Sequence, residues 1–446
     1  MRAKPPAERV SLVEKVSYGL GDLSASLAWN AAAAFTLFFY TDVALLPAAA
    51  IGTLFLFTRI FDAGFDIAIG LAVDRTRTRW GQARPYLLFA AIPFGVLTFL
   101  TFVTPDASQD VRLIYAGVTY FLLGLLLSVT NIPFSAMLPM MTADLKEKLD
   151  LSAARSVGTS VGVILVTAAF MPAVAALGDG DQRKGFFLTA LIVGIVSSAM
   201  LLVTFANCKE RHTVRPESKG VVSDVSAMFS NQAWLSVAGF ATLNFVRFGA
   251  ILALTPYFAI NVLGQPWMIS VLMPTLSGTL LLGAFFAPPI LRRLGMRRGN
   301  TIALLIAAAL YVALPFCADA PWTFIAVYVV ASLSLSITMT ATYAMASDSV
   351  DYHQWRFGVR NEGLLAAGVA FAIKVGMAIG TAGVAYGLAA ANYDPRNVTP
   401  QAREMMSWLY YGIPLVVFAL QIACMQFYPV DKHRNEIAAA AKGAHA

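Results

Sequence analysis

Charged residues are scarce in this sequence. Only 13% of the 446 residues are Asp, Glu, Lys or Arg, whereas 58% are hydrophobic. A water-soluble globule of this length needs more polar surface than this composition supplies. The composition therefore excludes an ordinary soluble enzyme or binding module and predicts an integral membrane protein.

Cysteine and histidine are scarce as well, with three and four copies. The cysteines are far apart and show no metal-ligand spacing, and the histidines fall in expected loops or in the tail. No His-centred triad or His-Glu-x-x-His pattern lies in an apolar segment. We therefore expect no enzymatic activity, no metal centre and no cofactor. The first fifteen residues are basic and lack a short apolar core followed by a cleavage site, so no cleaved signal peptide is expected.

Long apolar runs dominate the chain. Twelve of them are long enough to span about 30 Å as helices. They lie at 17–39, 46–73, 86–104, 113–140, 152–177, 185–206, 233–261, 267–290, 301–318, 322–347, 363–391 and 404–428. The fold class is therefore predicted to be an all-α membrane protein with twelve transmembrane helices.

Lys and Arg gather in alternate loops and in the two tails, so the positive-inside rule places both termini in the cytoplasm. The net charge of +7 is split among short loops and forms no contiguous basic face. It is thus a topology signal, and no nucleic-acid partner is expected.

A polar segment, 207–230, separates two groups of six helices, 1–206 and 231–430, and a tail follows at 431–446. The halves resemble each other, since the loop from Gly70 to Arg84 has the glycine and arginine pattern of the loop from Gly283 to Arg298. Two six-helix bundles around a midplane site are typical of alternating-access transporters.

The second apolar run contains two acids one helical turn apart. At 100° per residue Arg59, Asp62 and Asp66 share one helix face, within about 60° of one another. Charges at membrane depth are costly and usually mark an ion or substrate path. Repulsion between the two carboxylates amounts to about 2–3 kcal/mol, which a bound cation or proton would relieve. The alternatives are snorkelling side chains or an Arg59–Asp62 pair that only joins helices.

Several motifs resemble those of the glycoside-pentoside-hexuronide:cation symporters, the melibiose permease group of the major facilitator superfamily. They are SYGLGD at 17–22, FYTD at 39–42, RIFDAGFDIAIG at 59–70, NIPF at 131–134 and DSVDY at 348–352. The resemblance runs from about Lys15 to Asp431 and implies the major facilitator fold of two six-helix bundles.

The resemblance also implies functional residues. A cation site would use Asp62, Asp66, Ser128 and Lys374, with a proton or a sodium ion as the coupling ion. Gating ion pairs would come from Asp74, Arg75, Asp348, Asp351, Arg360 and Glu362; a plain solvated loop is the alternative for the last four. In sodium-using members an Asn directly precedes the second acid of the second helix, which is Asp66 here. This chain has Phe65 in that place, and Phe offers no side-chain oxygen to sodium, so H⁺ is favoured over Na⁺.

Sugar-binding residues are expected at Asp22, Ser26, Trp29, Asn131, Arg155 and Arg247. Carboxylates and amides hydrogen-bond hydroxyls, and an aromatic ring packs on a pyranose face. Trp29 is otherwise a core or lipid-facing aromatic. The two arginines would pair a uronate carboxylate, or else hold an Asp or a helix-end carbonyl.

The chain is therefore interpreted as a monomeric importer of a glycoside, pentoside or hexuronide, coupled to a cation, in the plasma (inner) membrane. Two alternatives stay open. One is a lysophospholipid carrier of the same fold, and the other is a membrane sugar sensor that does not transport.

Overall fold

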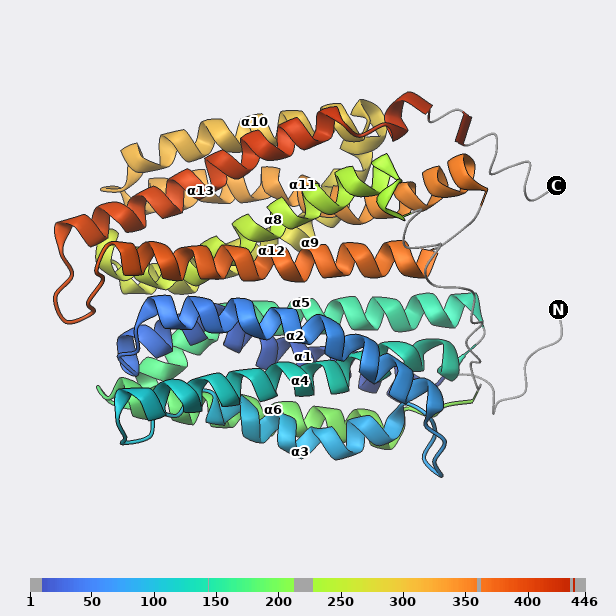
Figure 1. Ribbon diagram of the computed structural model, residues 1–446, viewed down its shortest axis with the longest axis horizontal. Helices are drawn as coiled ribbons and strands as arrows, with labels where there is room; N and C mark the ends of the chain where they lie inside the picture. The colour runs from blue at the N-terminus through green and yellow to red at the C-terminus, as the bar shows by residue number, and fades with distance from the viewer. Residues whose placement is uncertain (1–9, 143, 212–227, 359–361, 434–435, 438–446) are drawn as a thin grey trace. The chain divides into compact units, whose positions relative to one another are not determined.

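The computed structural model describes residues 10–142, 144–211, 228–358, 362–433 and 436–437, and long helices joined by short loops make up most of this part of the chain (Figure 1). The long helices of the first half are α1 (Leu12–Phe38), α2 (Ala48–Arg75), α3 (Arg84–Leu100), α4 (Gln109–Met141), α5 (Leu145–Gly178) and α6 (Gln182–Asn207). Those of the second half are α8 (Gln232–Tyr257), α9 (Ile269–Leu294), α10 (Met296–Ala313), α11 (Pro321–Phe357), α12 (Glu362–Ala390) and α13 (Pro400–Gln426). Each of the twelve predicted segments coincides with one of these helices.

Within the described residues, nine helices are long and apolar enough to cross a membrane. Two further stretches, Pro266–Leu280 and Phe285–Leu294, meet at 53°. They make a tenth span if they are counted as one bent helix. Shorter apolar helices, Ala48–Thr58 in α2 and Arg84–Leu100 in α3, account for the remaining two predicted spans. The chain is an all-α integral membrane protein, as its composition predicts.

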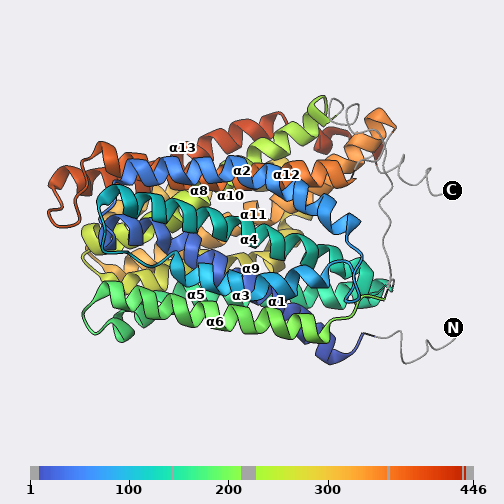
Figure 2. The same cartoon turned by 60° about the horizontal axis from the view of Figure 1, so that its bottom comes forward.

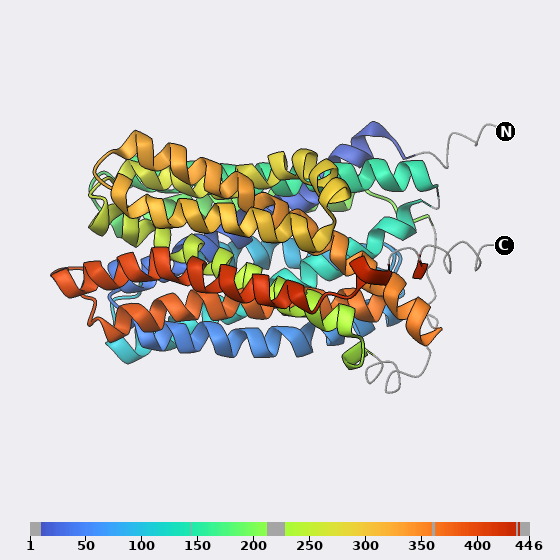
Figure 3. The ribbon, with the colours of Figure 1, turned by 90° about the horizontal axis from the view of Figure 1, so that it is seen from above.

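The chain divides into two compact units, Met1–Glu217 and Ser218–Ala446, and the division falls inside the polar segment at 207–230. In the first unit α1 packs on α5 and α6, and α3 packs on α4 and α6 (Figure 2). In the second unit α8 packs on α12 and α13, and α10 packs on α11 and α13; Figure 3 shows α13, in red, running across α8. The equivalent helices thus make equivalent contacts, which matches the six-plus-six repeat.

A second mark of the repeat is a π-helical turn at the end of the first helix of each unit. These turns are η2 (Phe39–Val43) and η3 (Phe258–Val262). Each is followed by a left-handed residue, Leu45 at φ 56° and Gly264 at φ 64°. Glycine adopts this conformation freely, whereas a leucine costs about 1–2 kcal/mol there. The same break in both halves shows that the repeat extends to the backbone conformation.

Glycines let the central helix pair of each unit approach backbone to backbone. A Cβ on Gly158 of α5 would lie 2.1 Å from the Gly19 carbonyl oxygen of α1. In the second unit a Cβ on Gly376 or Gly380 of α12 would lie 2.3 or 2.0 Å from a carbonyl oxygen of α8. Both pairs use the small-xxx-small spacing that supports close helix contact in membranes. Gly376 and Gly380 therefore have a packing role in the α8–α12 contact.

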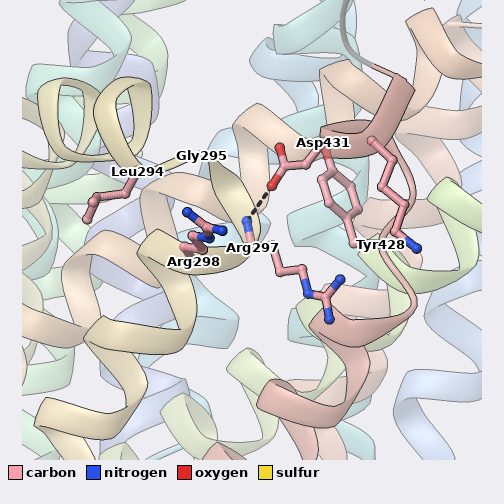
Figure 4. Close-up of a pocket in the computed structure, with 7 residues that line it drawn as sticks. Leu294, Gly295, Arg297, Arg298, Tyr428 and Asp431 are labelled. Atoms are coloured by element: carbon pink, nitrogen blue, oxygen red, sulfur yellow. Dashed lines mark hydrogen bonds between the residues drawn. The ribbon is translucent and has the colours of Figure 1, made fainter.

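Each unit also ties its last segment to the start of its third helix. Both Glu210 oxygens accept hydrogen bonds from three consecutive backbone N–H groups at the start of α3, at 2.7–2.9 Å. Asp431 accepts from the backbone of Arg297 at 2.7 Å at the start of α10, in the pocket shown in Figure 4. A carboxylate at a helix N-terminus satisfies free donors and complements the helix dipole. Each six-helix bundle is thus closed on itself.

Two glycines of α12 form a matched pair for testing the packing. Gly380→Ala should lower the thermal unfolding midpoint of the purified protein, because overpacking costs about 1–3 kcal/mol. Gly383→Ala meets nothing within 4 Å and should leave the midpoint unchanged or raise it slightly. Equal midpoints for the two variants would contradict the close α8–α12 contact.

Candidate functional site

A bidentate ion pair joins α1 to α5 in the first unit. Arg155 donates from Nε to Asp22 Oδ2 at 2.9 Å and from Nη2 to Oδ1 at 3.3 Å. Thr159, one turn further along α5, donates from its hydroxyl to the same Oδ2 at 3.1 Å. The Asp22 and Arg155 side chains expose 11% and 26% of their surface, so the pair can be reached from outside the protein.

The close α1–α5 contact makes this pair possible. Asp has a short side chain, and its carboxylate reaches the neighbouring helix only where the two backbones are near each other. Gly19 and Gly158 provide that approach one turn from Asp22 and Arg155. Asp22 and Arg155 were both predicted as sugar ligands, and the structure brings them together as partners of each other.

Two buried aromatic rings lie beside the pair. Tyr18 and Phe134 are stacked with ring centroids 4.5 Å apart, and the Tyr18 hydroxyl donates to the Phe134 carbonyl oxygen at 3.2 Å. The Arg155 guanidinium lies 5.0 Å from the centre of the Phe134 ring. Tyr18 and Phe134 are only 0% and 2% exposed, so the two rings support the Arg155 guanidinium and are not themselves open to a sugar.

Sequence reasoning gave no role to Tyr18, Phe134 or Thr159. Tyr18 and Phe134 belong to the motifs SYGLGD and NIPF, which were recognised only as marks of the family. Thr159 falls one turn after Arg155, and this spacing was a usable signal.

The other predicted sugar ligands of the first unit lie on α1 and α4, two of the three helices that form this cluster. Ser26 and Trp29 continue the Asp22 face of α1, at four and seven residues from it. Ser26 is buried, whereas Trp29 is half-buried. Asn131 is exposed on α4, one turn before Phe134. Their contact with a sugar stays a prediction.

The first acid of α2 points into its own unit. Asp62 is 5% exposed, and a Cβ on Gly124 of α4 would lie 3.1 Å from its Oδ1. Ser128, one turn after Gly124, is also buried, while Asp66 is half-buried. Glycine at 124 leaves the room that the carboxylate occupies. The Arg59 side chain lies outside the described residues.

Lys374 is half-buried on α12, two residues before the packing glycine Gly376. It belongs to the second unit, whereas Asp62 and Asp66 belong to the first. The expected approach of this lysine to the two acids stays a prediction.

Arg247 of α8 is 1% exposed, and its Nη2 donates to Asn244 Oδ1 at 3.1 Å. Asn244 in turn donates to the Thr342 hydroxyl of α11 at 3.1 Å. The guanidinium is therefore enclosed by helices of its own unit. The predicted contact between Arg247 and a sugar stays a prediction.

The predicted gating residues are only partly described. Asp348 on α11 accepts a hydrogen bond from the Tyr428 hydroxyl at 3.0 Å, which joins α11 to the segment after α13. Asp351 is half-buried and Arg75 is exposed at the end of α2. Arg360 and the side chains of Asp74 and Glu362 lie outside the described residues, and the gating role stays a prediction.

Comparison with known proteins establishes the family. Residues 17–432 match the family described as MFS/sugar transport protein. The chain belongs to this family. It is a membrane transporter of the sugar and cation symporter group and not an enzyme.

Relatives of similar length support this membership. The candidate glycoside/cation symporter YagG of Escherichia coli (strain K12) is 34% identical, over 96% of this chain and 94% of that one. The isoprimeverose transporter of Lactiplantibacillus pentosus is 31% identical, over 97% and 92%. The crystal structure of a D-xylose-proton symporter has a TM-score of 0.67 at 12% identity, covering 93% and 97%, and it shows the shared fold.

A double-mutant cycle tests the ion pair. Asp22→Asn and Arg155→Gln should show a coupling of about 1.5–3 kcal/mol in unfolding free energy, because the hydrogen bonds are charged and partly buried. The pair Lys15–Asp150 joins the same two helices but is more exposed, with 23% and 44% of the side-chain surfaces accessible. Its coupling should stay below about 1 kcal/mol. Equal coupling energies for both pairs would contradict the stronger interaction expected for Asp22 and Arg155.

Proposed function

We propose that this protein imports a neutral glycoside or pentoside together with a monovalent cation, by alternating access. The proposal places it in the plasma (inner) membrane with both termini in the cytoplasm. The observation that carries the substrate part is the bidentate, partly exposed Asp22–Arg155 pair.

The charge balance favours a neutral substrate. Arg155 already has a carboxylate partner, and Arg247 is enclosed within the second unit. Neither arginine offers a free, accessible guanidinium to a uronate. A sugar hydroxyl can instead accept from Arg155 and donate to Asp22 without leaving either ion unpaired. Among the expected substrates, the hexuronide therefore ranks below the glycoside and the pentoside.

The coupling part of the proposal depends on α2. Asp62 is a buried acid beside Gly124 and Ser128, and Asp66 follows one turn later. A proton needs no further ligand than a carboxylate, whereas sodium needs several oxygens, and Phe65 supplies none. One proton entering across 100 mV releases about 2.3 kcal/mol, which is enough for about 40- to 50-fold accumulation of a neutral sugar.

Replacing either acid of α2 should uncouple transport. In vesicles, Asp62→Asn and Asp66→Asn should each reduce sugar accumulation to about the external concentration, because the driving ion is no longer carried. Asp110→Asn, an exposed acid in the first turn of α4, is the control and should accumulate sugar normally. Full accumulation by both α2 variants would refute the coupling role.

One set of uptake assays tests the driving ion and the substrate class independently. Radiolabelled xylosides, glucosides, galactosides and glucuronides are offered to vesicles under a pH gradient or a sodium gradient, each imposed alone. We expect uptake of neutral sugars under the pH gradient and none under sodium alone. Stimulation by sodium only would overturn the choice of ion. Uptake of a fluorescent lysophospholipid without any sugar would overturn the substrate class.

A further inference from the structure

A buried arginine on α8 of the second unit has no acidic partner among the residues that the structure describes. Arg247 is 1% exposed and is the largest fully buried side chain in the described part of the protein. Its Nε and Nη1 have no hydrogen-bond partner among the described residues, and it takes part in none of the ion pairs found there. The Asn244 amide oxygen is a neutral acceptor. The positive charge is therefore not balanced by the protein groups that surround it.

The neighbours of the guanidinium are hydroxyl groups from three other helices. Tyr311 of α10 and Tyr328 of α11 interact with it electrostatically. Tyr410 of α13 and Ser332 of α11 lie next to Tyr328. The four hydroxyls are buried, and each lacks a hydrogen bond of normal geometry within the described residues. They are close enough to interact with one another as well as with the guanidinium.

This arrangement is unfavourable as it stands. An ionised guanidinium taken out of water costs several kcal/mol unless a negative charge accompanies it. Buried hydroxyls without partners add to that cost. A water molecule could accept some of the hydrogen bonds, but it would leave the charge uncompensated. A small anion could accept hydrogen bonds from Arg247 and from the hydroxyls and would neutralise the charge.

The size of the ligand is limited by the enclosure. The cluster is surrounded by α8, α10, α11 and α13, and its members expose at most 1% of their surface. The ring of Tyr410 is stacked on Phe258 at 3.9 Å, and that of Tyr311 packs against Phe418 at 5.5 Å. Aromatic walls of this kind leave no way in for a sugar or a uronate, so the ligand must be monatomic or nearly so.

We propose that the second unit contains a binding site for a small monovalent inorganic anion of the size of chloride. The anion lies between Arg247 and the hydroxyls of Tyr311, Tyr328 and Tyr410, with Ser332 beside them. It serves as an internal counter-ion that holds four helices of the unit together. The site is independent of the sugar and of the coupling cation.

The test measures the thermal stability of the purified full-length protein while chloride replaces gluconate at constant ionic strength. We expect the unfolding midpoint to rise by about 2–4 °C and to saturate, as it does when a ligand binds the folded state only. Arg247→Gln should abolish this rise, and Tyr328→Phe should shift it to higher chloride concentrations. Arg112→Gln removes a partly buried arginine that donates to the Ala44 carbonyl oxygen of the first unit, and it should keep the full rise.

A second measurement keeps the test decisive if Arg247→Gln fails to fold. Crystals of the unaltered protein grown in bromide should show an anomalous scattering peak between Arg247 and Tyr328. No chloride-dependent midpoint in the unaltered protein, or no bromide peak at this position, would overturn the proposal. A rise that persists in Arg247→Gln would overturn it as well.

Discussion

The distance between paired helix backbones is the constraint on which the first unit depends. Where Gly19 of α1 meets Gly158 of α5, no side chain keeps the helices apart. The short carboxylate of Asp22 can therefore reach the fork of Arg155, and the hydroxyl of Thr159 can reach the same oxygen. The second unit repeats the close approach between α8 and α12, where Gly376 and Gly380 lie against carbonyl oxygens. The same packing device thus supports two halves with different polar groups.

The charges inside this apolar protein are accommodated in three different ways. Asp22 has a cation of matching geometry, which makes the pair neutral while leaving both groups able to bind hydroxyls. Asp62 occupies space that a missing side chain at Gly124 provides. Among the described residues, the polar neighbours found for Arg247 are hydroxyls and an amide. Since a buried charge is costly in proportion to how poorly it is compensated, these three places differ in what they can attract. We propose a polyol as the ligand of the first, a cation for the second and an anion for the third.

Local patterns predicted much of this architecture. The apolar runs located all twelve helices, because a membrane-spanning length is a property of one continuous segment. The spacing of Asp62 and Asp66 placed both on one face of α2, because helix periodicity is local too.

Contacts between distant segments could not be predicted in the same way. Asp22 and Arg155 are 133 residues apart; both were expected to bind sugar, and the alternative of an Asp partner for Arg155 did not specify which Asp. Their pairing depends on which faces of α1 and α5 meet, and the meeting point is set by glycines whose partners are not visible in sequence. The surroundings of Arg247 are harder still, because they combine tyrosines from α10, α11 and α13. The spacing of residues within a single helix cannot predict such a cluster.

The carboxylate caps carry a consequence for how the protein is made. Glu210, which binds the start of α3, lies beyond the end of α6, so the ribosome adds it only after all six helices of the first bundle. The three backbone N–H groups at the start of α3 lack this partner while the intervening helices are being made. The contact between Glu210 and the start of α3 can therefore form only when the polar segment that leads to α8 is being made. Asp431 repeats the same order of events for the second bundle at the end of translation.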